Sequence, residues 1–159
     1  MCVGGYGFVE TSHHLFLGYN FFGSIWQLFR NWLDVHSADP SSIADHFLHF
    51  GSLSGYAKLK RSFMSLIWFA SSLVIWKERN DRIFKGKENV HARLLENIKL
   101  LSFCWFKAKF CCFPYQFHAW CQGPFLYLGV GYWFFGLLNP CCNYSVFFSC
   151  TSCAGKIVC

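Results

Sequence analysis

Charged residues are scarce in this sequence of 159 residues. Asp, Glu, Lys and Arg together make up 14% of the chain, where soluble domains typically carry roughly 25%. Between residues 110 and 155 the sequence has none of them. An intrinsically disordered chain is excluded all the same, because disorder requires low hydrophobicity and 54% of these residues are hydrophobic. The scarcity leaves two explanations: an apolar surface, or a segment that was never selected to be soluble.

A secretory signal is also missing. The first sixteen residues contain no basic region followed by an apolar stretch and a small-residue cleavage site. We therefore expect an intracellular protein, nuclear or cytoplasmic, that is not secreted. Nine of the ten cysteines lie at or after Cys104, but this setting disfavours a disulfide framework. Cys150 and Cys153 have the spacing of half a zinc site, which the adjacent Cys141 and Cys142 do not complete.

Recognisable catalytic motifs are absent as well. The sequence has no nucleophile elbow, no phosphate-binding loop and no carboxylate cluster for two metal ions. We therefore expect no enzymatic activity and no small-molecule substrate. His46 and His49 would lie on neighbouring turns of one helix and could share a metal ion. Without a third ligand nearby, we expect them to be two exposed helix histidines.

Long hydrophobic runs are short or interrupted. Ser62 to Trp76 is a run of fifteen residues without charge. As a helix it would span about 22 Å, short of the roughly 30 Å hydrocarbon core of a bilayer. We expect a buried helix that ends in the charged run through Arg82. Gly, Pro and Asn interrupt the apolar window from 125 to 148. A small membrane protein with one transmembrane segment near 125–148, or near 63–76, stays open as the alternative.

Helical periodicity is what the sequence does contain. Apolar residues recur at spacings of three and four, and we expect four helices: Phe22 to Asp34, Asp39-Pro40 to about Gly51, Ser62 to Trp76, and Glu88 to Phe106. The stretch from Gly51 to Gly55 is typical of a loop, and beyond Cys111 regular structure is only weakly indicated. The predicted fold class is mainly α, with about four helices, an irregular N-terminal segment and an unstructured or poorly ordered C-terminal tail.

Basic residues are concentrated in the middle third. Between Lys58 and Lys109 lie twelve basic and four acidic residues, a net charge of +8. Such a segment could bind nucleic acid non-specifically through phosphates. The candidate contacts are Lys58, Lys60, Arg61, Lys77, Arg79, Arg82, Lys85 and Lys87. An ordinary solvated helix face is the favoured interpretation from the sequence alone.

Several short motifs in order resemble one known family. They are Cys2, Glu10-Thr11, His14-Leu15-Phe16, Phe22-Gly23-Ser24-Ile25-Trp26 and Trp76-Lys77-Glu78-Arg79-Asn80 followed by Arg82. The sequence resembles the zinc-binding region that follows the reverse transcriptase in plant LINE-type (non-LTR) retrotransposons. The resemblance covers about residues 2 to 130, and the Trp-Lys-Glu-Arg-Asn run is its most specific piece.

The resemblance implies four zinc ligands, of which two remain. Cys2 takes the first position and His14 the third, while Tyr6 and Tyr19 stand where the family has its second and fourth cysteines. Zinc requires four Cys or His ligands, and a phenol that titrates near pH 10 is a poor substitute for a thiolate. We expect no cofactor, because zinc binding is lost.

The resemblance also implies a division of the chain. Residues 1–22 form a degenerate zinc-finger-like segment, 23–112 a helical region associated with the reverse transcriptase, 113–130 the end of the family-like part, and 131–159 an unassigned tail rich in Cys and aromatic residues. The family's endonuclease and polymerase would lie upstream and have no counterpart here. The expected function is that of a non-catalytic remnant whose auxiliary nucleic-acid-binding role is lost.

Overall fold

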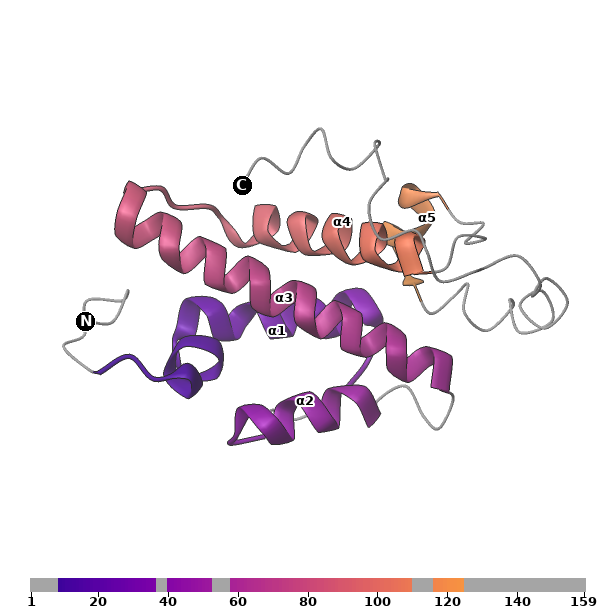
Figure 1. The fold of residues 1–159 in the computed structure, drawn as a ribbon, viewed down its shortest axis with the longest axis horizontal. Helices are drawn as coiled ribbons and strands as arrows, with labels where there is room; N and C mark the ends of the chain where they lie inside the picture. The colour runs from indigo at the N-terminus through magenta and orange to yellow at the C-terminus, as the bar shows by residue number, and fades with distance from the viewer. Residues whose placement is uncertain (1–8, 37–39, 53–57, 110–115, 125–159) are drawn as a thin grey trace, which may run out of the picture.

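The computed structural model describes residues 9–36, 40–52, 58–109 and 116–124 (Figure 1). These residues are mainly helical and contain no strand, which confirms the predicted fold class. The elements in chain order are a π-helical turn η1 (His14–Gly18), α1 (Asn20–Leu33), α2 (Ile43–Ser52), α3 (Lys58–Lys85), α4 (His91–Lys109) and α5 (Phe117–Gln122).

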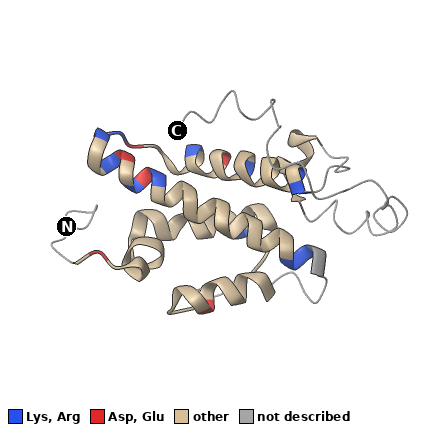
Figure 2. Cartoon of the chain, in the orientation of Figure 1, with Lys and Arg blue, Asp and Glu red and all other residues tan. Residues whose placement is uncertain are grey.

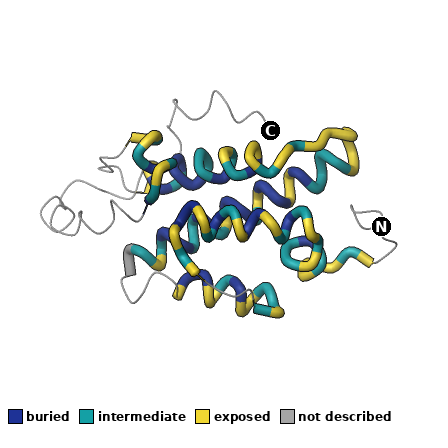
Figure 3. Tube along the Cα trace, turned by 180° about the vertical axis from the view of Figure 1, so that it is seen from behind, coloured by how far each residue is buried: buried dark blue, intermediate teal, exposed yellow. Residues whose placement is uncertain are grey.

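The long helix α3 organises the molecule. Helix α4 packs along one side of α3 and α2 along the other, while α1 crosses behind and also contacts α4 (Figure 1). Buried residues follow the inward faces of these helices (Figure 3). The core is strongly aromatic, which accounts for part of the high Phe and Trp content. Its largest fully buried side chains are Trp26, Phe22, Phe29, Phe63 and Phe106.

Helix α1 follows its sequence pattern closely. The six apolar positions that predicted it are all buried: Phe22, Ile25, Trp26, Phe29, Trp32 and Leu33. The helix ends where Asp34 adopts the left-handed conformation, with φ of 52°, and donates its N–H to the Arg30 and Asn31 carbonyl oxygens. A side chain of Asp type tolerates this conformation better than most residues do.

Helix α2 begins later and ends later than expected. Its N-cap is Ser42, whose hydroxyl accepts the Asp45 backbone N–H at 3.1 Å and donates to the Asp45 carboxylate at 2.7 Å. Pro40 precedes the helix, and Asp39, where the helix was expected to begin, lies outside the described residues. The predicted loop from Gly51 is wrong at its start, because Gly51 and Ser52 belong to α2. Ser42 caps this helix start because its hydroxyl bonds both the backbone N–H and the carboxylate of Asp45.

Helix α3 runs through the charged segment that was expected to end it. The helix continues to Lys85, supported by i,i+4 ion pairs from Glu78 to Arg82 and from Asp81 to Lys85. Such pairs stabilise a helix instead of breaking it. It ends at Gly86, which has a φ of 59°, in the left-handed region that favours Gly.

The uncharged run from Ser62 to Trp76 is a buried part of α3, as expected. Phe63, Met64 and Ile67 have no exposed surface. None of the helices that the structure describes is both long enough and apolar enough to cross a membrane. The alternative window at 125–148 lies outside the described residues.

Helix α4 matches its predicted range to within three residues, and its Leu94 and Ile98 are buried. The short helix α5 was not predicted. It carries Trp120, which is 2% exposed and packs edge-on against the Phe63 and Phe103 rings. A six-residue helix has too few turns to show a period in the sequence.

Two cysteines fall within the described residues. Cys104 on α4 is disulfide-bonded and Cys121 on α5 is a free thiol. One bridged cysteine does not make a disulfide framework, so the expectation that such a framework is disfavoured stays a prediction.

Candidate functional site

The motifs that carry the family resemblance meet in space. Glu10, from the Glu-Thr motif, accepts a hydrogen bond from Arg79 Nε at 2.7 Å and forms an ion pair with the same guanidinium. Thr11 Oγ1 accepts the His14 backbone N–H at 3.1 Å, which starts the η1 turn. The segment before α1 is therefore fastened to the C-terminal half of α3, although the paired residues are 69 positions apart.

The turn into α1 contacts the same half of α3. The Arg82 guanidinium lies 3.9 Å from the centre of the Phe21 ring and 5.9 Å from that of Phe22. Gly23 allows the close turn, since a Cβ there would lie 3.0 Å from the Leu17 carbonyl oxygen. Trp26 Nε1 donates to the Phe16 carbonyl oxygen at 2.8 Å. These contacts give the Phe-Gly-x-x-Trp motif a structural role.

A buried carboxylate joins α3 to the start of α4. Glu78 is 2% exposed and accepts hydrogen bonds from Arg82 Nε at 2.8 Å, the Asn89 backbone N–H at 2.8 Å and Asn89 Nδ2 at 2.7 Å. The Arg82 guanidinium also donates to the Asn89 carbonyl oxygen at 3.3 Å. Each charge of this pair is satisfied by several polar partners, as a buried ion pair requires.

Three of the eight candidate nucleic-acid contacts are therefore committed to internal pairs. Arg79 binds Glu10, Arg82 binds Glu78, and Lys85 Nζ lies 2.6 Å from the Asp81 carboxylate. The hydrogen bond from Lys85 lowers the pKa of Asp81, so this carboxylate stays charged at neutral pH. Neutralised cations contribute little to phosphate binding.

The other candidates keep their charge available. Lys77, Lys87 and Arg61 are exposed and form no ion pair with a carboxylate of the described residues. Lys60 is half-buried, and the side chain of Lys58 lies outside the described set.

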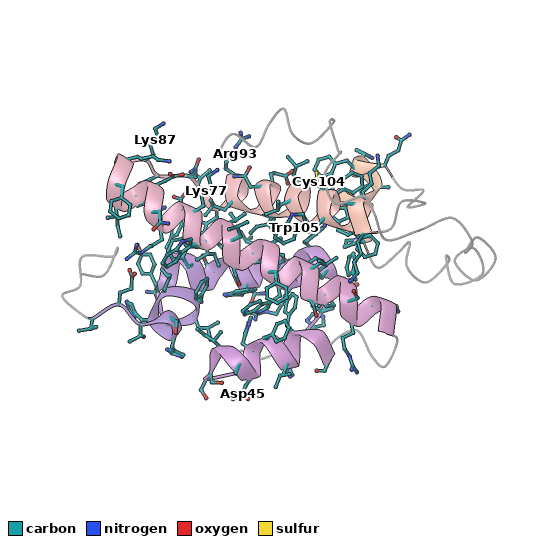
Figure 4. The ribbon with its side chains drawn as sticks, viewed as in Figure 1. Asp45, Lys77, Lys87, Arg93, Cys104 and Trp105 are labelled. Atoms are coloured by element: carbon teal, nitrogen blue, oxygen red, sulfur yellow. The ribbon has the colours of Figure 1, made fainter. Side chains whose placement is uncertain are left out.

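The list of candidate contacts ended at Lys87 and did not include Arg93, which is exposed at the start of α4. Figure 4 shows Lys77, Lys87 and Arg93 along the edge where the C-terminal half of α3 faces the start of α4. Figure 2 shows that acidic residues also lie at this end of the molecule. Glu78 and Asp81 are paired internally, and Glu88 lies 3.9 Å from the Arg82 guanidinium. Arg93 lies six positions beyond Lys87 in the sequence, and the packing of α4 on α3 places both residues along this edge.

The residues at the expected zinc position do not fit the metal. His14 lies in η1 and Tyr19 caps its end, with ring centroids 6.4 Å apart. The Tyr19 ring packs edge-on against Phe22 at 5.3 Å, so this side chain serves as an apolar contact. Cys2 and Tyr6 lie outside the described residues. A donor set with two phenols lacks the four Cys or His ligands of a structural zinc site.

The histidine pair on α2 differs from the prediction. His46 is 4% exposed, and its Nδ1 accepts the Trp68 Nε1–H at 3.0 Å. Its ring packs 4.5 Å from that of Trp26. His49 is exposed, as expected. His46 is a core residue, and no group of three metal-ligating side chains occurs in the part of the chain that the structure describes.

No protein-family model, curated protein or solved structure matches this chain.

Proposed function

We propose that the chain is a non-catalytic remnant of the polyprotein of a plant LINE-type retrotransposon. It would derive from the region similar to the zinc-binding segment that follows the reverse transcriptase. In this proposal zinc binding is lost and contact with nucleic acid is weak and non-specific. An intracellular location, nuclear or cytoplasmic, belongs to the same proposal.

The observation that carries this proposal is the meeting of the family-like motifs. The Glu10–Arg79 ion pair joins the Glu-Thr motif to the Trp-Lys-Glu-Arg-Asn run, and Arg82 stacks on the Phe21 ring beside the Phe-Gly-x-x-Trp turn. When motifs that lie far apart in the sequence contact one another through complementary groups in the fold, this is expected if they belong to one inherited folding unit. The same contacts give each motif a structural role, so no catalytic role is needed to explain the motifs.

The remaining nucleic-acid contact is assigned to Lys77, Lys87 and Arg93. They are exposed, carry no partner carboxylate among the described residues, and line one edge of the molecule (Figure 4). Three cations on a helical surface can bind phosphates but read no base sequence. The binding should therefore be sensitive to salt and insensitive to sequence.

Fluorescence anisotropy with a labelled single-stranded RNA tests this assignment. Three phosphate contacts predict a slope of log affinity against log salt of about −2, a loss of about 15-fold between about 50 and 200 mM salt. An affinity that does not change with salt would exclude the proposed contact. A slope of about −3.5 or steeper would mean that the internally paired Arg79 and Arg82 bind phosphate too.

A charge-matched pair of variants locates the contact. Replacing Lys77, Lys87 and Arg93 by Gln should reduce RNA affinity at least about tenfold. Replacing Lys60, Arg61 and Lys107 by Gln removes the same charge elsewhere and should reduce it by less than about threefold. Equal losses in the two variants would show that net charge alone, and no particular edge, binds the RNA.

A further inference from the structure

Helix α3 carries an apolar stripe on its solvent side. Its members are Phe69, Leu73, Trp76 and Ile83, which are 50%, 47%, 47% and 41% exposed. On the opposite side of the same helix, Ile67, Ala70 and Glu78 are buried. A surface helix normally exposes polar residues to solvent. Packing against the core therefore does not explain why this outward face is apolar.

The spacing of the stripe is that of a helix–helix seam. Leu66, Phe69, Leu73, Trp76, Asn80 and Ile83 follow one another at intervals of three, four, three, four and three. This is a strict repeat of seven, with apolar a and d positions and one Asn at an a position, as in coiled coils. The stripe from Leu66 to Ile83 would be about 26 Å long. Its shape fits a second helix of about five turns.

The described elements of the chain leave the stripe largely uncovered. Helix α2 touches one end of it, where the Phe47 and Phe69 ring centroids are 5.4 Å apart. Aromatic side chains of this size bury about 150–250 Å² each, so the stripe exposes on the order of 300 Å² of apolar surface. Patches of that size on a monomer are often functional.

The charges beside the stripe select the partner. In the seven-residue repeat Lys77 takes the e position, where a partner helix places opposite charge. Arg79 takes the g position but is already paired with Glu10. The carboxylates near this part of α3 are engaged: Glu78 with Arg82, Asp81 with Lys85, and Glu10 with Arg79. Lys77 has no such partner among the described residues. A second copy of the chain would bring the net charge of +8 between Lys58 and Lys109 against itself, whereas an acidic helix would neutralise Lys77.

We propose that the outward stripe of α3 is the docking site for an amphipathic helix of another protein, with apolar a and d positions flanked by Asp or Glu. The apolar seam supplies the binding energy, and Lys77 together with the net positive charge of this segment disfavours basic helices and other copies of this chain. The site shares Lys77 with the edge assigned to nucleic acid and differs from that edge in depending on the apolar seam.

Titration with two synthetic peptides tests this proposal on the full chain. Both have about three heptads with Leu at a and d; one has Glu and the other Lys at e and g. Isothermal titration calorimetry should show the Glu peptide binding at least about tenfold more tightly than the Lys peptide. Equal affinities would overturn the charge argument, and failure of both to bind would overturn the site.

Variants that leave the net charge unchanged distinguish binding at the stripe from binding to exposed apolar residues in general. The double variant Leu73→Ser, Trp76→Ser should weaken Glu-peptide binding at least about tenfold and leave RNA affinity unchanged. The control Val9→Ser, Val90→Ser removes two apolar residues that are exposed elsewhere and should change peptide binding by less than about twofold. Circular dichroism checks that both variants remain helical.

Sedimentation equilibrium tests whether a second copy of the chain occupies the stripe instead. The chain alone should remain monomeric at concentrations where the Glu peptide binds. A dimer that the Leu73→Ser, Trp76→Ser variant abolishes would assign the stripe to a second copy and overturn the proposal.

Discussion

Glu78 holds Asn89 at both of its carboxylate oxygen atoms, through the Asn89 backbone N–H at 2.8 Å and its side-chain amide at 2.7 Å. The two residues are eleven positions apart and belong to the end of α3 and the segment that leads into α4. The carboxylate thus fixes the angle at which the chain turns back along α3. The Trp-Lys-Glu-Arg-Asn run owes its role in the fold largely to this one side chain.

Glu78→Ala should strongly destabilise the protein. The change leaves Arg82, whose side chain is 9% exposed, and the Asn89 amide without their acceptor. Removing one partner of a buried pair costs about 3–5 kcal/mol. The free energy of unfolding in urea, followed by circular dichroism, measures the effect. Glu96→Ala is the matched control, because that 53% exposed carboxylate forms a surface pair with Lys99 worth less than about 1 kcal/mol. Similar losses of stability in Glu78→Ala and Glu96→Ala would contradict the stabilising role of the buried Glu78 network.

His46→Leu should destabilise the contact between α2 and α3. The substitution keeps the apolar volume beside the Trp26 ring but leaves the Trp68 Nε1–H without its acceptor. A buried donor deprived of its partner costs about 1–3 kcal/mol. His118→Leu, at an exposed position of α5, should change the free energy of unfolding by less than about 0.5 kcal/mol. An unchanged free energy of unfolding in His46→Leu would mean that the Trp68–His46 hydrogen bond adds nothing to the stability that packing provides.

The parts of the fold that the sequence predicted are those governed by periodicity. One apolar face of α1 and the buried run of α3 could be read from spacing alone, because burial repeats with the helical turn. Interaction partners that are distant in sequence could not be predicted from spacing. Nothing near Arg79 indicates that Glu10 neutralises it, so the basic run looked more available to nucleic acid than it is. His46 was misassigned for the same reason, since its partner Trp68 lies on another helix.

The end of α3 shows a different limit. A run of charged residues is typical of a solvated surface, and the sequence alone does not say whether that surface is a loop or a helix. The stabilising pairs from Glu78 to Arg82 and from Asp81 to Lys85 have i,i+4 spacing, which was readable and points to a helix. Gly86, the residue that ends the helix, was readable too.

Restoring the two missing ligands should restore zinc binding. The family resemblance predicts that Tyr6→Cys together with Tyr19→Cys completes a Cys₃His site with Cys2 and His14. We expect one zinc ion per chain in this variant after dialysis, measured by plasma mass spectrometry, and no stoichiometric zinc in the unchanged protein. Cys2→Ser in the restored variant should abolish binding again. One tightly bound zinc ion in the unchanged protein would contradict the loss of the site, and none in the restored variant would contradict the resemblance.

The Cys121 thiol should react slowly with alkylating reagents in the folded protein. Burial raises the pKa of Cys121, and the negative charge of Glu96 raises it further, so less reactive thiolate is present at pH 8 than for an ordinary cysteine. The deficit should shrink as the pH rises toward and above the raised pKa. Peptide-resolved mass spectrometry of iodoacetamide labelling, with and without urea, measures this. Glu96→Gln should speed labelling of the folded chain and leave the rate in urea unchanged, whereas equal folded and unfolded rates at pH 8 would show that burial does not protect the thiol.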